Sequence, residues 1–150
     1  MHVEIQYSIF MVNKPGVLAK VLTEVATAKI NIVAMTMMDS IEHGVMRVVC
    51  GSPKKIREVL SKMNMPYDET NVLCVTLPNK AGALASVAQK LSHAHINISY
   101  AYCTAGARGG RTTGVLKVAD VKKAMKVLKT HTDRTAKSKP TVRRSPASRK

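Results

Sequence analysis

The chain has 150 residues, 45% of them hydrophobic, which is enough for one ordinary domain or two very small ones with a packed core. It contains no run of about eighteen apolar residues. The start of the chain also lacks the basic-then-apolar order of a secretory signal. We therefore expect a folded, cytoplasmic protein without a membrane segment.

Positive charge is in excess throughout the chain. Lysine and arginine number 24 against nine acidic residues, a formal net charge of +15. Residues 130–150 hold seven of the basic residues and one acid, Asp133, which leaves 17 basic and eight acidic residues in 1–129, a net +9. A polyanion would be attracted to both parts.

The three cysteines, Cys50, Cys74 and Cys103, are far apart, and each lies in an apolar stretch. An odd number of widely spaced cysteines does not fit a disulfide framework, and their spacing is not that of a zinc site. We expect all three to be reduced core residues.

A repeat at an offset of 66 residues organises the chain. Residues 9–19 align with 75–85 and residues 28–32 with 94–98, and ten of thirty positions between 9–38 and 75–104 are identical without a gap. Two unrelated strand–helix units would not place both asparagines and the glycine in register. We therefore expect two copies of one small fold.

In the first copy, apolar residues alternate with polar ones from Val3 to Met11, which predicts a strand with one buried face. After a turn at 13–16, apolar residues at helical spacing from Leu18 to Val25 predict a helix, with Pro15 suited to its first turn. Strands are expected at 30–38 and 45–50, joined by a polar turn at 39–44. Ser52 and Pro53 then open a second helix with apolar positions from Ile56 to Met63.

The second copy repeats this order. We expect strands at 73–77, 96–103 and 112–118, a helix stripe from Leu84 to Leu91, and a last helix capped by Asp120 that runs through Leu128. The order is that of the βαββαβ, ferredoxin-like fold, an α+β class with antiparallel sheets and both helices on one face. Residues 65–69 and 130–133 show no apolar alternation, so the fourth strands should be short or missing, particularly in the second copy.

A strand that ends in Asn-Lys-Pro-Gly-Val-Leu, followed by an amphipathic helix and Ile-Asn-Ile, resembles the ACT domain, and the pattern occurs here twice. The pairing is similar to that of the stand-alone tandem ACT proteins of bacteria. The resemblance covers residues 3–129 and predicts ACT module 1 at 1–69, ACT module 2 at 70–129 and a disordered basic tail at 130–150.

Because ACT domains commonly bind amino acids, pair their sheets side by side and regulate metabolic enzymes or transcription, the resemblance implies a sensor. We expect a free amino acid as ligand, and a metabolic enzyme or a second copy of the chain as protein partner. No catalytic domain is expected, so the protein would be a detached regulator.

The bends before the first helix of each copy suit a zwitterionic ligand. Helix starts offer unpaired N–H groups and a positive dipole end to a carboxylate, glycines allow close approach, and asparagine amides both donate and accept. By resemblance, the asparagine in each bend and the asparagine that opens the following strand contact the ligand. The predicted ligand-binding residues are Asn13, Lys14, Pro15, Gly16, Val17, Leu18, Asn31 and Ile32 in the first copy, and Asn79, Lys80, Ala81, Gly82, Ala83, Leu84, Asn97 and Ile98 in the second.

Other interpretations remain open for these residues. Asn13 and Asn79 would also serve as helix caps, and Asn31 and Asn97 would bond the preceding turn. The polar residue that some serine-binding members carry two places before the loop asparagine is here Met11 or Leu77, which disfavours serine and leaves room for a more apolar amino acid.

Several methionines and aromatic residues also have two interpretations. Tyr100 and Tyr102 share one sheet face and would either wall a pocket or pack in the core or between the modules, the second being favoured. Met35, Met37 and Met38 are expected to fill the core or an interface.

Neither a metal site nor an enzyme is expected. His93 and His95 lack two further ligands for zinc, and the glycine-rich stretch 106–114 joins two strands, unlike a phosphate-binding loop. No nucleophile, base and orienting acid can be joined by sequence logic, so we expect neither catalytic residues nor a cofactor.

The main alternative is a nucleic-acid-binding protein. The tail at 130–150 has too little apolar content to fold, and its cations would contact phosphates without reading sequence. A purely solubilising tail and an anionic protein partner are the other possibilities. Only five aromatic residues are available, which argues against RNA recognition on the sheet face.

Overall fold

A computed structural model describes residues 1–38, 43–104 and 110–136 of the chain, with side chains described through Lys129. The elements are β1 (His2–Val12), α1 (Val17–Thr27), β2 (Ile32–Met38), β3 (His43–Cys50), α2 (Pro53–Lys62), β4 (Tyr67–Pro78), α3 (Ala83–His93), β5 (Ile98–Cys103), β6 (Arg111–Val118) and α4 (Val121–Ala136). Within the described ranges, no helix is both long and apolar enough to span a membrane.

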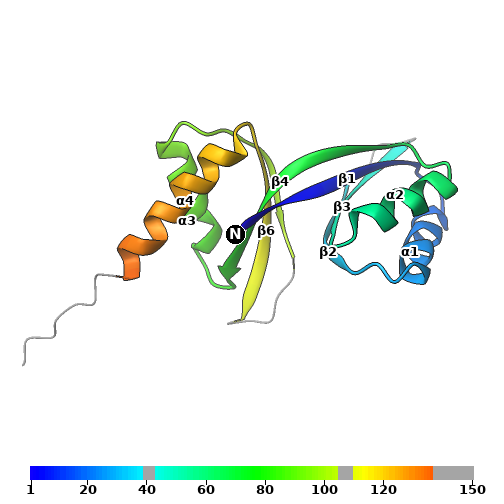
Figure 1. The fold of residues 1–150 in the computed structure, drawn as a ribbon, viewed down its shortest axis with the longest axis horizontal. Coiled ribbons are helices and arrows are strands. Elements are labelled where there is room, and N and C mark those ends of the chain that lie inside the picture. Colours follow the sequence, from blue (N-terminus) through cyan, green and yellow to red (C-terminus); the bar gives the residue numbers. More distant parts are fainter. Residues whose placement is uncertain (39–42, 105–109, 137–150) are drawn as a thin grey trace, which may run out of the picture.

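The six strands form one sheet in the order β2-β3-β1-β4-β6-β5, and every neighbouring pair is antiparallel. The two long central strands, β1 and β4, run from one half of the molecule to the other (Figure 1). We use the name first module for the half that contains α1 and α2, and second module for the half that contains α3 and α4. The α+β class and the strand–helix order predicted from the sequence are confirmed.

The central strands are shared between the modules. The start of β4, from Tyr67 to Thr70, pairs with β1 as the fourth strand of the first module, and its end pairs with β6 as the first strand of the second. The start of β1, residues 2–5, pairs only with β4, beyond the point where β3 joins the ladder at Gln6. That segment occupies the fourth-strand position of the second module, since no strand follows β6 in the described residues up to Ala136.

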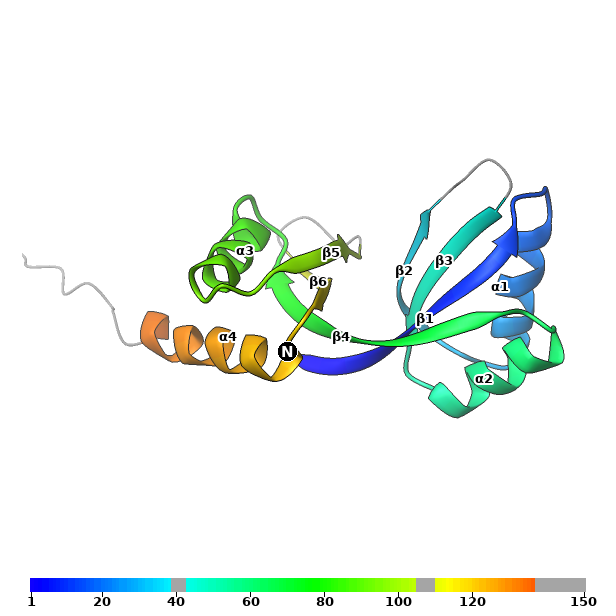
Figure 2. The ribbon, with the colours of Figure 1, turned by 90° about the horizontal axis from the view of Figure 1, so that it is seen from above.

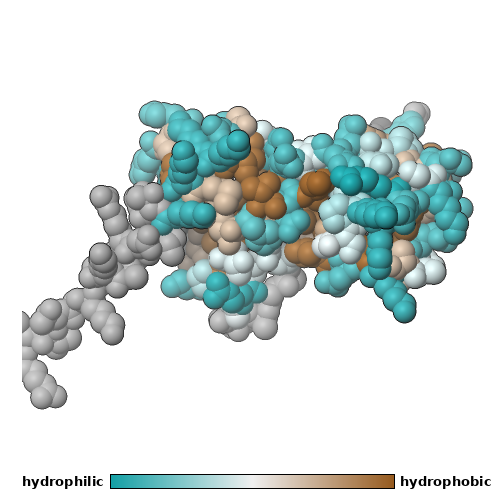
Figure 3. Space-filling model, viewed as in Figure 1, coloured by the Kyte–Doolittle hydropathy of each residue, from teal (hydrophilic) through white to brown (hydrophobic). Residues whose placement is uncertain are grey.

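Each helix pair covers one face of its half of the sheet, as the apolar periodicity predicts, and the two pairs lie at opposite ends of the molecule (Figure 2). Val21 and Val25 of α1 pack with Ile56 and Leu60 of α2 on the alternate residues of β1 that begin at Tyr7. The second core has the same plan and contains Leu73, Val87, Leu91, Leu116, Ala124 and Leu128. Apolar residues also gather on the surface over the middle of the molecule, where β1 and β4 join the halves (Figure 3).

The helix-free faces of the two halves meet at a third buried cluster. Ala34 and Val49 of the first module pack there with Val72, Cys74 and Val115, and Tyr102 of β5 borders the cluster. Contact between β1 and β5 requires the sheet to curl, because these strands are three positions apart in it. Of the interpretations left open for the tyrosines of β5, packing between the modules is the one that the structure shows.

Three expectations differ from the structure. Strand β4 begins at Tyr67 and runs through the predicted module boundary at 69/70, because pairing with β1 rather than its own apolar pattern keeps this segment extended. Helix α4 continues to Ala136, past the predicted tail start at 130, since an established helix gains one hydrogen bond per added residue. Cys103 is exposed, unlike the buried Cys50 and Cys74, because it lies at the end of an edge strand.

Parts of three other predictions lie outside the described residues. They concern the turn at 39–42, the glycine-rich loop at 105–109 and the tail at 137–150.

Candidate ligand-binding site

Two bends of the same geometry connect a central strand to the first helix of each module. In the first, the Lys14 N–H donates to the Val12 carbonyl at 3.0 Å and the Val17 N–H to the Lys14 carbonyl at 3.3 Å. In the second, Lys80 donates to Pro78 at 2.9 Å and Ala83 to Lys80 at 3.3 Å. The repeat in the sequence therefore extends to the backbone hydrogen bonds.

Each bend ends in a glycine that serves as the N-cap. Gly16 has φ 87° and Gly82 φ 81°, a left-handed conformation that L residues rarely adopt, and no other atom lies within 4 Å of where a Cβ would stand. Gly16 and Gly82, rather than Asn13 and Asn79, occupy the N-cap positions of α1 and α3. In each first turn the leading N–H group, of Val17 or Ala83, is bonded to the lysine carbonyl of the bend, and the next two amide hydrogens are left for solvent or a ligand.

The bends are open to solvent. Residues 13–16 and 80–82 are exposed, and Asn79 is half-buried, with its backbone N–H bonded to the Gly110 carbonyl at 2.8 Å. Val17 and Leu18 turn inward and pack on the first core, and Ala83 packs on the second, whereas Leu84 is 38% exposed.

Two cavities flank the bend of the second module. One, of about 570 Å3, lies along α3 and is lined by Lys80, Gly82, Ser86 and Lys90, among others. The other, of about 260 Å3, lies between the bend and the strands β5 and β6. Asn79, Lys80 and Leu84 border the smaller cavity from the bend, and Cys103, Thr104 and Thr112 border it from the strands.

Sequence reasoning missed the polar residues on the strands. The Thr104 hydroxyl oxygen accepts from the Thr113 N–H at 3.0 Å, and the Thr112 hydroxyl donates to the Thr104 carbonyl. The repeat aligns Cys103 and Thr104 with Met37 and Met38, and this alignment is the sequence signal that could have drawn attention to Cys103 and Thr104. The alignment alone does not show that their side chains reach the bend.

Within a module, the structure does not bring the two predicted asparagines together. Asn31 and Asn97 lie just after left-handed turns at Lys29 (φ 54°) and His95 (φ 53°), at the far end of the helix. An eleven-residue helix is about 16 Å long, so Asn13 and Asn31 are at opposite ends of the sheet.

The strand asparagines have surroundings of their own. Asn31 and Asn97 are exposed, while the neighbouring Ile32 and Ile98 pack against the cores. Asn97 and Ile98 border a separate cavity of about 420 Å3, together with Ser92 and His95.

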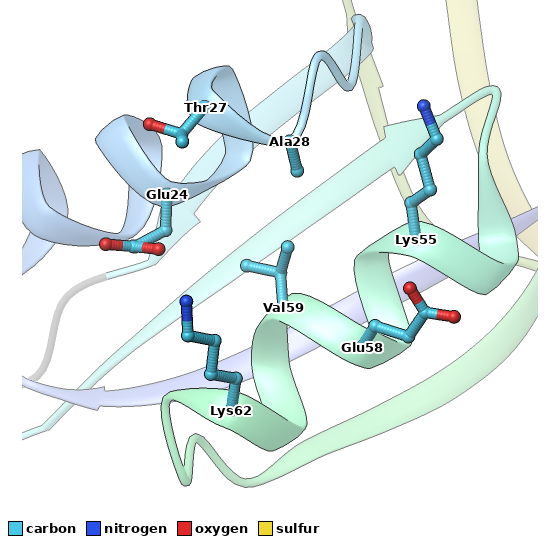
Figure 4. A pocket seen from close by; sticks show the side chains of 7 residues that line it. All are labelled: Glu24, Thr27, Ala28, Lys55, Glu58, Val59 and Lys62. Carbon is cyan, nitrogen blue, oxygen red and sulfur yellow. The ribbon is translucent and has the colours of Figure 1, made fainter.

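A further cavity, of about 360 Å3, opens between α1 and α2 and contains none of the predicted residues. Figure 4 shows Glu24 and Lys62 on one side of Val59, with Lys55 and Glu58 on the other. Its rim consists of positively and negatively charged surface side chains, and apolar residues line its floor. Unlike the bends, this cavity has no helix N-cap among its lining residues.

Two of the described residues, Cys50 and Cys74, are buried cysteines. Burial raises the pKa of the Cys50 thiol, and it raises the pKa of the Cys74 thiol to about 11, so neither buried cysteine is a ready nucleophile. No group of three His, Cys, Asp or Glu side chains that could hold a metal ion occurs in the described ranges.

Two ferredoxin-like halves, each with a glycine-capped bend beside a sheet, define a tandem α+β protein. The chain belongs to the family of ACT domain pairs, whose pattern it matches over residues 1–138.

Solved structures are similar to this chain over most of its length. Protein BT0572 from Bacteroides thetaiotaomicron is 30% identical, with a TM-score of 0.80 over 87% of this chain and 89% of that one. The regulatory subunit of aspartate kinase from Thermus thermophilus, in its ligand-free form, is 13% identical with a TM-score of 0.63, over 87% of this chain and 97% of that one.

Escherichia coli aspartokinase III, in complex with lysine and aspartate, is 18% identical with a TM-score of 0.55, over 89% of this chain and 31% of that one. At these identities the two kinase structures show the shared fold alone. No curated protein sequence matches the chain.

Proposed function

We propose that this protein is a non-catalytic regulator that binds a free amino acid at its two bends and thereby modulates a metabolic enzyme or another regulator. The observation that carries the proposal is the pair of exposed, glycine-capped bends with first-turn amides unused by side-chain caps. A regulatory role agrees with the ACT pair family and with the regulatory subunit among its structural relatives.

The bends match the two charged groups of an amino acid. The first-turn amides and the dipoles of α1 and α3 attract a carboxylate. Lys14 and Lys80 add positive charge beside them, and the asparagine side chains and bend carbonyls supply acceptors for an ammonium group. The structure of aspartokinase III, which shares the fold, is a complex with lysine and aspartate.

A second copy of the chain would complete the site. Strand β2 is an edge strand that runs parallel to β1, and it exposes Val33, Met35 and Met37 by 37%, 40% and 40%. If β2 paired antiparallel with β2 of a second copy, Asn31 of one chain would approach the end of the sheet where Asn13 of the other lies. A homodimer would thus place these two asparagines at the same end of the combined sheet, whereas a single module keeps them at opposite ends.

Thermal unfolding with each of the twenty L-amino acids tests the proposal. Ligand at a hundredfold excess over its Kd adds about 2.7 kcal/mol of stability, so one or two amino acids should raise the unfolding midpoint. The matching D-amino acids are the control, because a site with fixed donors and acceptors distinguishes enantiomers. If no L-amino acid acts, amino-acid sensing is refuted.

Two further measurements complete the test. Sedimentation with and without the active amino acid should show that ligand favours the dimer. Recovery of that amino acid unchanged after prolonged incubation would agree with a binding protein, and its conversion would show that the protein is an enzyme.

A further inference from the structure

The two ligand sites differ in the residues that the strands contribute. Strand pairing sets the correspondence: Leu77 is paired with Thr112 as Met11 is with Gly44, and Cys103 is paired with Gly114 as Met37 is with Met46. The bends have the same asparagine and lysine in both modules. The side chains that face the bend from the strands are Cys103, Thr104 and Thr112 in the second module, with Met37, Met38 and Gly44 as their counterparts.

We infer that the two modules select different amino acids, the second one with a hydroxyl-bearing side chain and the first one with an apolar side chain. The inference rests on the proposed function, because it assigns ligand classes to the same two bends.

In the second module the strands offer polar groups to a small cavity. Thr112 and Thr104 lie with their hydroxyl oxygens 3.4 Å apart, and the Thr112 hydroxyl proton is directed to the Thr104 carbonyl. The Thr112 oxygen therefore retains acceptor capacity for the hydroxyl proton of a ligand. The cavity of about 260 Å3 is close to the lower end of ligand pockets, as a single small amino acid requires.

In the first module methionine side chains lie beside the corresponding position on the strand. The terminal methyl of Met37 lies 3.6 Å, and Cγ of Met11 3.9 Å, from the position that a Cβ on Gly44 would take. The thioether side chain thus lies beside the position that corresponds to the Thr112 side chain in the second module. Methionine is flexible and polarisable, so it adapts to an apolar ligand side chain but offers it no strong hydrogen bond.

These linings discriminate between ligands of equal shape. A hydroxyl that enters the methionine-lined site loses its hydrogen bonds to water without replacement, whereas an apolar side chain in the second module leaves the threonine oxygen without a partner. A site that hydrogen-bonds a hydroxyl should prefer it over the isosteric methyl by roughly tenfold or more.

Calorimetric titration with two matched ligand pairs, L-threonine with L-valine and L-serine with L-alanine, tests the inference on the full chain. A hydroxyl-bearing member should saturate at one equivalent per chain, and an apolar amino acid at one equivalent without competing with it. Exchange of the strand residues should exchange the preferences.

The double variant Cys103→Met/Thr112→Gly should bind the hydroxyl-bearing ligand at least roughly tenfold more weakly. The reciprocal variant Met37→Cys/Gly44→Thr should gain a second equivalent of it. Gly44 does not have a positive φ, and the Cβ of its replacement meets only ordinary contacts, so the backbone accepts threonine there.

The outcomes separate this inference from the proposed function. If one amino acid fills both modules with equal affinity and neither exchange alters it, selectivity is refuted while sensing stands. Binding of charged or aromatic amino acids alone has the same meaning, and binding of none refutes both. Should a double variant not fold, the near-isosteric Thr112→Val replaces it, with a roughly tenfold loss expected for threonine relative to valine and no change contradicting the inference.

Discussion

Gln6 connects the two modules through its side chain. It is fully buried, its amide donates to the Tyr100 hydroxyl at 2.7 Å and to Ser8 Oγ at 3.3 Å, and its carbonyl accepts from the Tyr102 hydroxyl at 3.0 Å. The Arg47 guanidinium lies 3.9 Å from the centre of the Tyr100 ring. Because Gln6 and Arg47 belong to the first module and both tyrosines to the second, these contacts hold the curled sheet closed.

Replacement of Gln6 by alanine should lower the free energy of unfolding by about 2–4 kcal/mol, because it leaves two tyrosine hydroxyls without this partner and a cavity between the modules. Urea denaturation measures the change. Ser8→Ala is the matched control and should cost under about 1 kcal/mol, since Ser8 is half-buried and makes only the longest of the three bonds. Equal losses in both variants would contradict the role given to Gln6.

Tyr7 is buried in the first core. Burial, and after it the negative charge of Glu69, raises the pKa of Tyr7 from 10.0 to about 12. The folded state therefore favours the protonated phenol more than the unfolded chain does. The protonated Tyr7 phenol therefore contributes its full share of the unfolding free energy below pH 10, and this contribution should be lost as the pH rises to about 12.

Urea denaturation at several alkaline pH values checks this, with Tyr7→Phe as the comparison. The variant lacks the ionisable hydroxyl, so its stability should decline less steeply above pH 10 than that of the natural chain. Parallel declines would show that Tyr7 does not contribute to alkaline unfolding.

At the scale of elements, local pattern predicted most of the fold. The alternation in β1 and the helical stripes in α1, α2 and α3 each mark one buried face, and such faces are encoded within the segment itself. The Asp120 cap is confirmed by its bond to the Lys123 N–H at 2.8 Å. The segment 67–71 could not be recognised in this way, because pairing with a distant strand keeps it extended.

The same long-range pairing makes the start of β1 part of the second module. Removal of residues 2–5 should cost at least about 2 kcal/mol of unfolding free energy, because it leaves one edge of β4, from Asn71 to Cys74, without its partner strand and removes the packing that Met1 makes at the second core. Hydrogen exchange of the β4 amides at 72–75 should accelerate.

The control for this deletion is Val3→Thr. It keeps the backbone pairing at a side chain that is 42% exposed, and should cost under about 0.5 kcal/mol. Unchanged exchange at 72–75 after the deletion would mean that β1 does not support the second module.

At the scale of the whole molecule, the repeat predicted the two bends. Each bend needs one residue in the left-handed conformation, and both copies have a glycine at that position, Gly16 and Gly82. Their chemical difference could not be predicted, since it depends on which strand residues face each bend. The curl of the sheet could not be predicted from the sequence either. Alternation places the tyrosines of β5 on one face of the sheet, but it does not show that Gln6 lies opposite them.

Shared strands and a shared buried cluster should make the modules unfold together. Far-ultraviolet circular dichroism and tyrosine fluorescence should give coincident urea transitions, because neither half keeps all of its strand partners once the other opens. Two separated transitions would instead show modules of independent stability.

The remaining whole-molecule property is charge, which underlies the alternative function as a nucleic-acid-binding protein. Residues 137–150 carry six basic residues and no acid. If this segment neutralises phosphates, duplex DNA should bind the full chain with an affinity that falls steeply between roughly 50 and 200 mM salt. The logarithm of the binding constant should fall by about 0.9 per phosphate neutralised for each tenfold rise in salt concentration.

A chain that ends at Ala136 should bind more weakly and with a shallower slope, without dependence on DNA sequence. Identical gel shifts for the two chains would exclude the segment from any nucleic-acid contact and leave the net positive charge of residues 1–136 as the source of whatever binding is seen.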